Sequence, residues 1–265
     1  MINKLIFIII SLFILGCQTS NQDIENKSEQ EHPCGGEQFN VPSEFDSPYF
    51  GSWPYNPDKE MISDPGFGEC PKANGCECDT NDTCPENSEC TQLFRGKYCV
   101  PKIGSTIPRF KGIDQFGDEF DLYDLANQGK PILLEIGSAS PKACNDFSSW
   151  RSHISDEATK QKWWKNKFSK VRDLIDNQDL YWVHIIHLDV NKNPATAETV
   201  RSWYENYPHD NIIVLADPES KMKTWVRPTG YPCMLLIDEN MILQVHTLRG
   251  IEDAIDGLYQ TLDIK

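Results

Sequence analysis

The sequence lacks the signatures of several large functional classes. It contains no glycine-rich phosphate loop, no nucleophile elbow and no His-Glu-x-x-His pattern, so nothing indicates a nucleotide-binding protein, a hydrolase of the elbow type or a zinc protease. It also lacks an excess of basic residues. The chain has 25 Lys and Arg and 40 Asp and Glu, which gives a net charge of −15. Nucleic acid and anionic membrane surfaces are therefore not expected as partners.

The N-terminal segment is typical of an exported protein. Lys4 precedes an apolar run over residues 5–15, which is too short to span a bilayer as a stable helix but suits the core of a signal peptide. The run ends in Gly16 and Cys17, which resemble the lipobox of bacterial lipoproteins, where the cysteine is lipidated and becomes the mature N-terminus. We expect residues 1–16 to be a signal peptide and Cys17 a lipid anchor. An ordinary signal peptide and an uncleaved anchor helix are the alternatives.

The residues after Cys17 are polar and have almost no large apolar side chains. Residues 17–33 cannot bury enough surface to offset chain entropy, so the sequence predicts a flexible tether. Gln18 is not the aspartate that retains bacterial lipoproteins in the inner membrane. We expect a cell-envelope protein held by its lipid, at the outer membrane and facing the periplasm where the cell has one, and we interpret its acidity as an aid to solubility.

Six of the ten cysteines fall within residues 70–102, called here the cysteine-rich module. The module is rich in turn-forming residues and poor in apolar ones, and a segment with so little core needs covalent cross-links. We therefore predict disulfides of undetermined pairing, with zinc binding through Cys76 and Cys78 as the alternative. The six residues are Cys70, Cys76, Cys78, Cys84, Cys90 and Cys99. Residues 34–69 show no helical or alternating period, and we expect an irregular segment against a neighbouring domain.

Residues 103–265 are enough for one globular domain of the α/β class. The apolar patterns predict two hairpins, three further strands and three helices. We expect a hairpin over 109–114 and 119–122, strands at 131–138, 181–189 and 212–215, helices at 142–175 with a break near 155, at 195–204 and at 251–262, and a closing hairpin over 233–238 and 242–248.

Two stretches of this domain resemble the thioredoxin-like family. Residues 129–144 run from Gly-Lys-Pro through a buried strand to Cys144, and residues 230–238 contain Pro232 followed by Cys233. Ile237-Asp238 and Arg249-Gly250 fit the same family. The resemblance implies a thioredoxin-like fold, with a central mixed sheet flanked by helices. It also implies that Pro232 is a cis-proline, packed against the helix that carries Cys144.

The sequence departs from this family at its reactive centre. Pro141 stands where the family has the first, nucleophilic cysteine of a Cys-x-x-Cys pair, and Cys144 keeps the second position. Proline suits a first helical turn, because it has no N–H to leave unpaired, but it cannot supply a thiol. Three interpretations of Cys144 remain open: a redox-active or structural disulfide with Cys233, a single reactive thiol favoured by Lys142, or a buried inert residue. Apart from Cys17, nine cysteines remain, so at least one lacks an intramolecular partner.

The resemblance implies a thiol–disulfide oxidoreductase that acts on envelope proteins or small thiols. Cys144 and Cys233 would be the catalytic residues, and Pro141, Tyr231 and Pro232 would shape a substrate groove, with the backbone of Tyr231 pairing with an extended peptide. The main alternative is a binding module that catalyses nothing, and a peroxiredoxin-like peroxidase and a copper-handling protein are weaker ones. We predict no cofactor and no metal site.

Overall fold

The structure is a computed structural model that describes residues 47–264. The predicted signal peptide, the predicted lipidation site Cys17, the predicted tether and Cys34 lie outside these residues. Within the described part of the chain, none of the helices combines the length and the apolar character that a membrane span requires.

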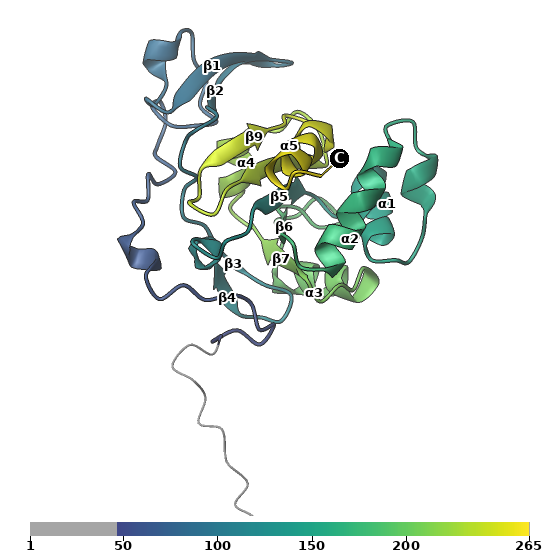
Figure 1. The fold of residues 1–265 in the computed structure, drawn as a ribbon. Coiled ribbons are helices and arrows are strands. Elements are labelled where there is room, and N and C mark those ends of the chain that lie inside the picture. The colour runs from purple at the N-terminus through teal and green to yellow at the C-terminus, as the bar shows by residue number, and fades with distance from the viewer. Residues whose placement is uncertain (1–46, 265) are drawn as a thin grey trace, which may run out of the picture. The chain divides into compact units, whose positions relative to one another are not determined.

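A five-stranded mixed sheet forms the centre of the molecule, with the strand order β7-β6-β5-β8-β9 (Figure 1). The central strand β5 (Ile132–Gly137) is parallel to β6 (Tyr181–Ile186), which is parallel to β7 (Ile212–Ala216). On its other side β5 is antiparallel to β8 (Cys233–Ile237), which pairs antiparallel with β9 (Leu243–His246). Every residue of β5, β7 and β8 is buried, as expected of strands covered on both faces.

Helices and a small hairpin cover the two faces of the sheet (Figure 1). Side chains alternate along a strand, so Leu133 joins one hydrophobic cluster and Leu134 joins the other. The first face is covered by α1 (Lys142–Arg151), α2 (Lys170–Asp176), α3 (Ala197–Asn206) and α5 (Glu252–Thr261). The second is covered by α4 (Lys221–Val226), the hairpin of β3 (Lys111–Ile113) and β4 (Glu119–Asp121), and the 3-10 helix 122–125.

This arrangement confirms the predicted thioredoxin-like α/β fold. The sheet order, the helix after β5 and the proline loop before β8 are those that the resemblance implied. The helix expected over 142–175 is α1 and α2, separated by 152–169 with 3-10 helices at 157–160 and 166–169. The sequence analysis missed α4, because a helix of six residues is too short to show a helical period.

The cysteine-rich module contains a hairpin and three disulfides, which confirms its predicted character. Strand β1 (Ser88–Leu93) pairs antiparallel with β2 (Gly96–Pro101). The disulfides join Cys70 to Cys76, Cys78 to Cys90 and Cys84 to Cys99. One of the module's hydrophobic clusters consists of cysteines alone, so the bridges take the place of a core there. All six thiols are used, so the module has no thiolate left for the alternative zinc site.

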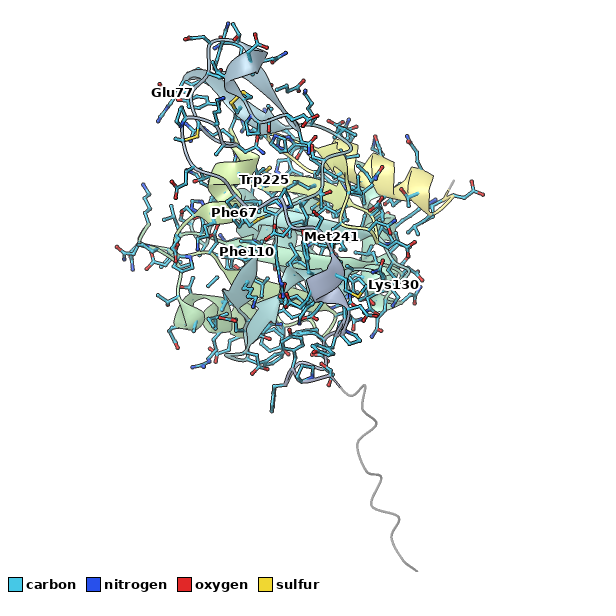
Figure 2. The ribbon with its side chains drawn as sticks, turned by 90° about the vertical axis from the view of Figure 1, so that its left-hand side faces the viewer. Phe67, Glu77, Phe110, Lys130, Trp225 and Met241 are labelled. Carbon is cyan, nitrogen blue, oxygen red and sulfur yellow. A yellow bond between two sulfur atoms is a disulfide. The ribbon has the colours of Figure 1, made fainter. Side chains whose placement is uncertain are left out.

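The module and residues 47–69 both pack on the second face of the domain. The Arg227 guanidinium after α4 lies over the ring of Tyr98, 3.8 Å from its centroid. Residues 47–69 contain one 3-10 helix (Lys59–Met61), and the indole N–H of Trp53 donates to Asp114 over 2.8 Å. Figure 2 shows this side of the molecule, where Phe110, Trp225 and Met241 belong to the buried cluster and Phe67 packs against it.

Candidate functional site

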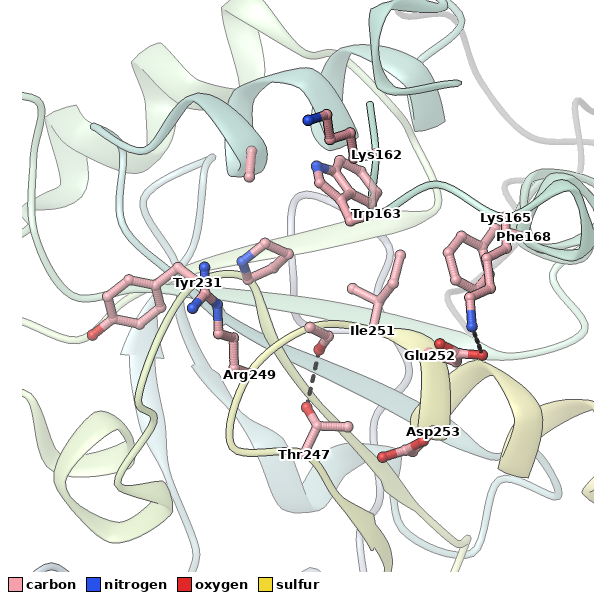
Figure 3. Close-up of a pocket in the computed structure, with 13 residues that line it drawn as sticks. Lys162, Trp163, Lys165, Phe168, Tyr231, Thr247, Arg249, Ile251, Glu252 and Asp253 are labelled. Carbon is pink, nitrogen blue, oxygen red and sulfur yellow. Dashed lines mark hydrogen bonds and ion pairs between the residues drawn. The ribbon is translucent and has the colours of Figure 1, made fainter. Parts of the chain in front are cut away.

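A groove lies beside the loop that precedes β8 (Figure 3). Its volume is about 410 Å³, and it is bordered by the start of α1, the segment after α1, the proline loop and the loop from β9 to α5. It is lined by Ala143, Lys162, Trp163, Lys165, Phe168, Tyr231, Pro232, Thr247, Arg249, Gly250, Ile251, Glu252 and Asp253.

Of the residues predicted for this groove, Tyr231 and Pro232 line it and Pro141 does not. The peptide bond between Tyr231 and Pro232 is cis, as the resemblance implied. Pro141 is instead the N-cap of α1, where its carbonyl accepts from the side-chain amide of Asn145 over 2.8 Å. Its role in the chain is therefore to begin the helix, and the residue that reaches the groove from this turn is Ala143.

Cys144 is completely buried in the first turn of α1. The pKa of its thiol is raised to about 12, chiefly by burial and in part by the nearby Glu135 carboxylate, although a backbone hydrogen bond at Ser138 and the charge of Arg151 oppose this. A helix N-terminus ordinarily favours a thiolate, but here desolvation outweighs that effect. A thiol with such a pKa is protonated at neutral pH.

Cys233 is the first residue of β8 and is also completely buried. Its thiol donates a hydrogen bond to the backbone carbonyl of Thr247 over 2.8 Å. Burial raises the pKa of this thiol to about 12, although the side-chain hydrogen bond of Thr247 opposes this. The donated bond belongs to the protonated thiol, so the contact fits a residue that packs and does not ionise.

The two cysteines are free thiols, so the pairing considered for Cys144 and Cys233 is not present in the structure. Cys144 belongs to the hydrophobic cluster under α1, whereas Cys233 belongs to the cluster on the other face of the sheet. Strand alternation explains the separation, because Cys233 faces away from its neighbour Met234, which packs under the helices. The arrangement matches the third interpretation from the sequence, and a catalytic role for either residue stays a prediction.

A buried polar cluster lies on the same face as Cys144. The Glu135 carboxylate forms an ion pair with Arg151 and accepts from the indole N–H of Trp182 over 3.2 Å. The Arg151 guanidinium also donates to Nδ1 of His184 over 2.9 Å. Burial alone would raise the pKa of Glu135, but the charge and hydrogen bond of Arg151, together with His184 and Trp182, outweigh it and the pKa is lowered. Burial lowers the pKa of His184 to about 4, so this ring is neutral.

Sequence reasoning missed this cluster, because its three polar members are far apart in the chain. Glu135 and His184 are directly opposite each other in the register of β5 and β6. The available signal was a carboxylate within an otherwise apolar buried strand, since charged groups in such strands are rarely left unpaired.

The groove combines a stretch of backbone without hydrogen bonds with aromatic side chains, three cationic side chains and two carboxylates. No backbone hydrogen bond joins Tyr231 to another described residue, although the carbonyl of Pro232 accepts from Gly250. The Arg249 side chain lies against Gly230 and has no ion-pair partner within residues 47–264. The half-buried Trp163 provides apolar surface, and the buried Ile251 lies near it (Figure 3). The groove can therefore pair with an extended chain and favour a negative charge in it.

No set of three metal-ligating side chains lines this groove in the described residues. His184 points into the buried cluster, and His187 packs against the ring of Tyr231 with centroids 5.3 Å apart. Two groups of potential ligands occur elsewhere. One consists of Cys78, Cys84 and Cys90, which are in disulfides, and the other consists of His153, Asp176 and His209.

No family model matches the chain, and no curated protein matches it significantly. Similar solved structures include the thioredoxin domain of a thiol-disulfide oxidoreductase from Bacteroides vulgatus, with 18% identity over 61% of this chain and 95% of that chain and a TM-score of 0.39. The exposed lipoprotein thioredoxin of Streptococcus pneumoniae is 21% identical over 58% and 98%, with a TM-score of 0.38. A peroxidoxin from Mycobacterium tuberculosis is 16% identical over 62% and 97%, with a TM-score of 0.41. At these values the likeness assigns no residue role or activity to this chain.

Proposed function

We propose that this chain is a thioredoxin-fold binding module of the cell envelope, which holds an extended polypeptide segment in the groove beside Pro232. The observation that carries the proposal is the contrast between the thiols and the groove. Cys144 has no exposed surface and the position before its helix is occupied by Pro141, whereas the groove is open and the Tyr231 backbone makes no hydrogen bond to another described residue. Peptide binding needs only the open groove, whereas dithiol exchange needs an accessible thiolate.

The side chains around the groove suit a segment with an apolar and an acidic residue. Trp163 offers apolar contact, and an aromatic side chain gives large contact area at low entropic cost. Arg249 supplies a cation without an intramolecular ion-pair partner in the described range. Lys165 is less available, because it pairs with Glu252. A bound strand would gain main-chain hydrogen bonds from Tyr231 and charge complementarity from Arg249.

The proposed location in the envelope is supported by two features. Residues 1–17 have the pattern of a lipoprotein signal ending at Cys17, and these residues lie outside the described part of the chain. The three disulfides of the cysteine-rich module fit an oxidising compartment. Attachment through the Cys17 lipid would place the groove at the end of a tether, within reach of other envelope proteins.

A thiol–disulfide oxidoreductase is the second candidate. The observation in its favour is that Cys144 lies in the first turn of α1, directly after Ala143, which lines the groove. For this activity the turn would have to open and expose the sulfur to the bound chain. The two candidates predict different behaviour of the Cys144 thiol.

The test uses the full chain purified in detergent and an unfolded, carboxymethylated model polypeptide as the probe. We expect saturable binding that Trp163→Ala and Arg249→Ala each weaken at least fivefold, while Arg201→Ala, an exposed arginine on α3, leaves it unchanged. Cys144→Ala should bind like the wild type, and iodoacetamide should not label Cys144 in the folded chain. If the wild type accelerates the reduction of insulin disulfides and Cys144→Ala does not, the oxidoreductase and not the binding module is the correct function.

A further inference from the structure

Two histidines and one aspartate meet on the side of the domain formed by the ends of α1 and α2. Nε2 of His153 lies 3.0 Å from Oδ2 of Asp176, and Nε2 of His209 lies 3.0 Å from Oδ1 of the same carboxylate. The two imidazole rings are stacked with centroids 6.4 Å apart. One ligand atom from each residue falls within 4.8 Å of the others, so all three can reach one point.

The three residues come from separate segments and are held together by neighbouring amides. His153 follows α1, Asp176 ends α2, and His209 precedes β7. The Asn211 side chain donates to the carbonyls of Ile175 and Asp176, over 3.0 and 3.2 Å, and so ties the loop of His209 to the end of α2. The positions of Asp176 and His209 are thus fixed by contacts that do not depend on a ligand.

We propose that His153, Asp176 and His209 bind a divalent transition-metal ion, with zinc as the ion that the donors suit best. Imidazole nitrogen and carboxylate oxygen are zinc ligands, and three protein ligands with a water in the fourth position complete a tetrahedral sphere. The exposed fraction of the side chain is 51% for His153 and 8% for His209, so the cluster is anchored on one side and open to water on the other. None of the three lines the groove, and the site is independent of the proposed function.

Metal binding fixes the tautomers of both rings. A metal takes the Nε2 lone pair, so the ring proton of each neutral imidazole moves to Nδ1. Without metal, Nδ1 of His209 accepts from the backbone N–H of Asn211 over 3.2 Å. This long hydrogen bond is lost when Nδ1 takes up the proton and Nε2 binds the metal. The carboxylate of Asp176 exchanges its hydrogen bonds to the two rings for a bond to the metal.

The site would join three segments that are otherwise connected through loops. A metal bound at this point clamps the end of α1 to the end of α2 and to the loop before β7. Because the ion binds only the folded arrangement of these residues, it raises the free energy of unfolding and the melting temperature.

Calorimetric titration of the full chain with Zn²⁺ tests the proposal. We expect one site that His153→Ala and His209→Ala each weaken at least tenfold, and a rise in melting temperature that both variants lose. Asp173→Asn is the matched control, since Asp173 is an exposed aspartate on α2 outside the cluster, and it should bind as the wild type does. Ca²⁺ and Mg²⁺ should give no rise in melting temperature.

The comparison between wild type and variants also separates this site from other donors. His32 and Cys34 lie outside the described residues. Any Zn²⁺ that they bind is the same in the wild type and in every variant, so it does not affect the difference between them. Circular dichroism of each variant at a temperature below its transition verifies that it is folded. Zn²⁺ binding by His153→Ala that equals that of the wild type, or equal stabilisation by Ca²⁺, would overturn the proposal and leave a surface cluster of hydrogen bonds.

Discussion

Arg151 and Glu135 form an ion pair inside the core of the domain, where their side chains are 2% and 0% exposed. Both lie on the face of the sheet that carries Cys144, and the charge of Glu135 is one reason why that thiol stays protonated. One carboxylate oxygen of Glu135, Nε of Arg151 and Nε2 of His184 have no hydrogen-bond partner among the described residues. The cluster therefore has little tolerance for the loss of any member.

Removal of Arg151 should strongly destabilise the fold. Arg151→Met leaves the Glu135 carboxylate buried without its cation, and breaking such a pair costs about 3–5 kcal/mol. Urea unfolding followed by tryptophan fluorescence measures the change. The control is Arg201→Met on α3, which breaks an exposed pair with Glu198 and should change the free energy of unfolding by less than about 1 kcal/mol. Equal effects of the two variants would contradict the prediction.

Stability should decrease as the pH falls from about 6.5 towards about 4. Burial lowers the pKa values of His184, His187 and His246 to about 4, from an ordinary value of 6.5. In this window the unfolded chain binds protons that the folded chain does not, so acid favours unfolding. Each histidine contributes a slope of about 1.4 kcal/mol per pH unit.

His246→Gln provides a way to measure one of these contributions. Nε2 of His246 lies 3.0 Å from the carbonyl of Val226, and a glutamine amide can donate to the same oxygen. We expect the variant to lose about 1.4 kcal/mol per pH unit from the slope of stability between pH 4 and 6.5. Urea unfolding at several pH values gives the slope. An unchanged slope would show that His246 titrates normally in the folded chain.

The sequence predicted the architecture of this domain because its strands and helices have strong local patterns. The apolar run around Leu134 indicates a buried strand, and the resemblance to the thioredoxin-like family implied a cis-proline at Pro232. Both were confirmed by β5 and by the cis peptide bond before β8. The six clustered cysteines predicted disulfides, but only the folded hairpin of β1 and β2 determines which sulfur atoms meet.

The candidate site was less accessible to sequence reasoning. Cys144 and Cys233 stood out as residue types, but their burial and their separation by the sheet depend on tertiary packing. Arg249 enters the groove only because the loop from β9 to α5 folds back beside Gly230. His153 and His209 are more than fifty residues apart, and no spacing rule relates donors that separate loops bring together.

Pro141→Cys should create a dithiol that the present chain lacks. Residue 141 is the N-cap of α1 and Cys144 lies three positions later, a separation of about 5–6 Å between Cα atoms that a disulfide can span. The new thiol would sit at the helix N-terminus, where exposed N–H groups lower its pKa. We expect the variant to reduce insulin disulfides, and Pro141→Ser to lack this activity. Failure of the cysteine variant to form a disulfide would show that this turn cannot bring the two sulfur atoms together.

Gly75 lies directly against Thr224 of α4, and it should be essential for docking of the cysteine-rich module. A Cβ at this position would collide with the Thr224 carbonyl oxygen, and the glycine has a φ of +83°, which other residues adopt only with strain. Gly75→Ala should therefore move the module away from α4 and increase amide hydrogen exchange in both segments. Gly66→Ala is the control, because Gly66 also has a positive φ but a Cβ added there would meet no atom within 4 Å. Equal exchange in the two variants would mean that backbone strain, and not contact with α4, determines the effect.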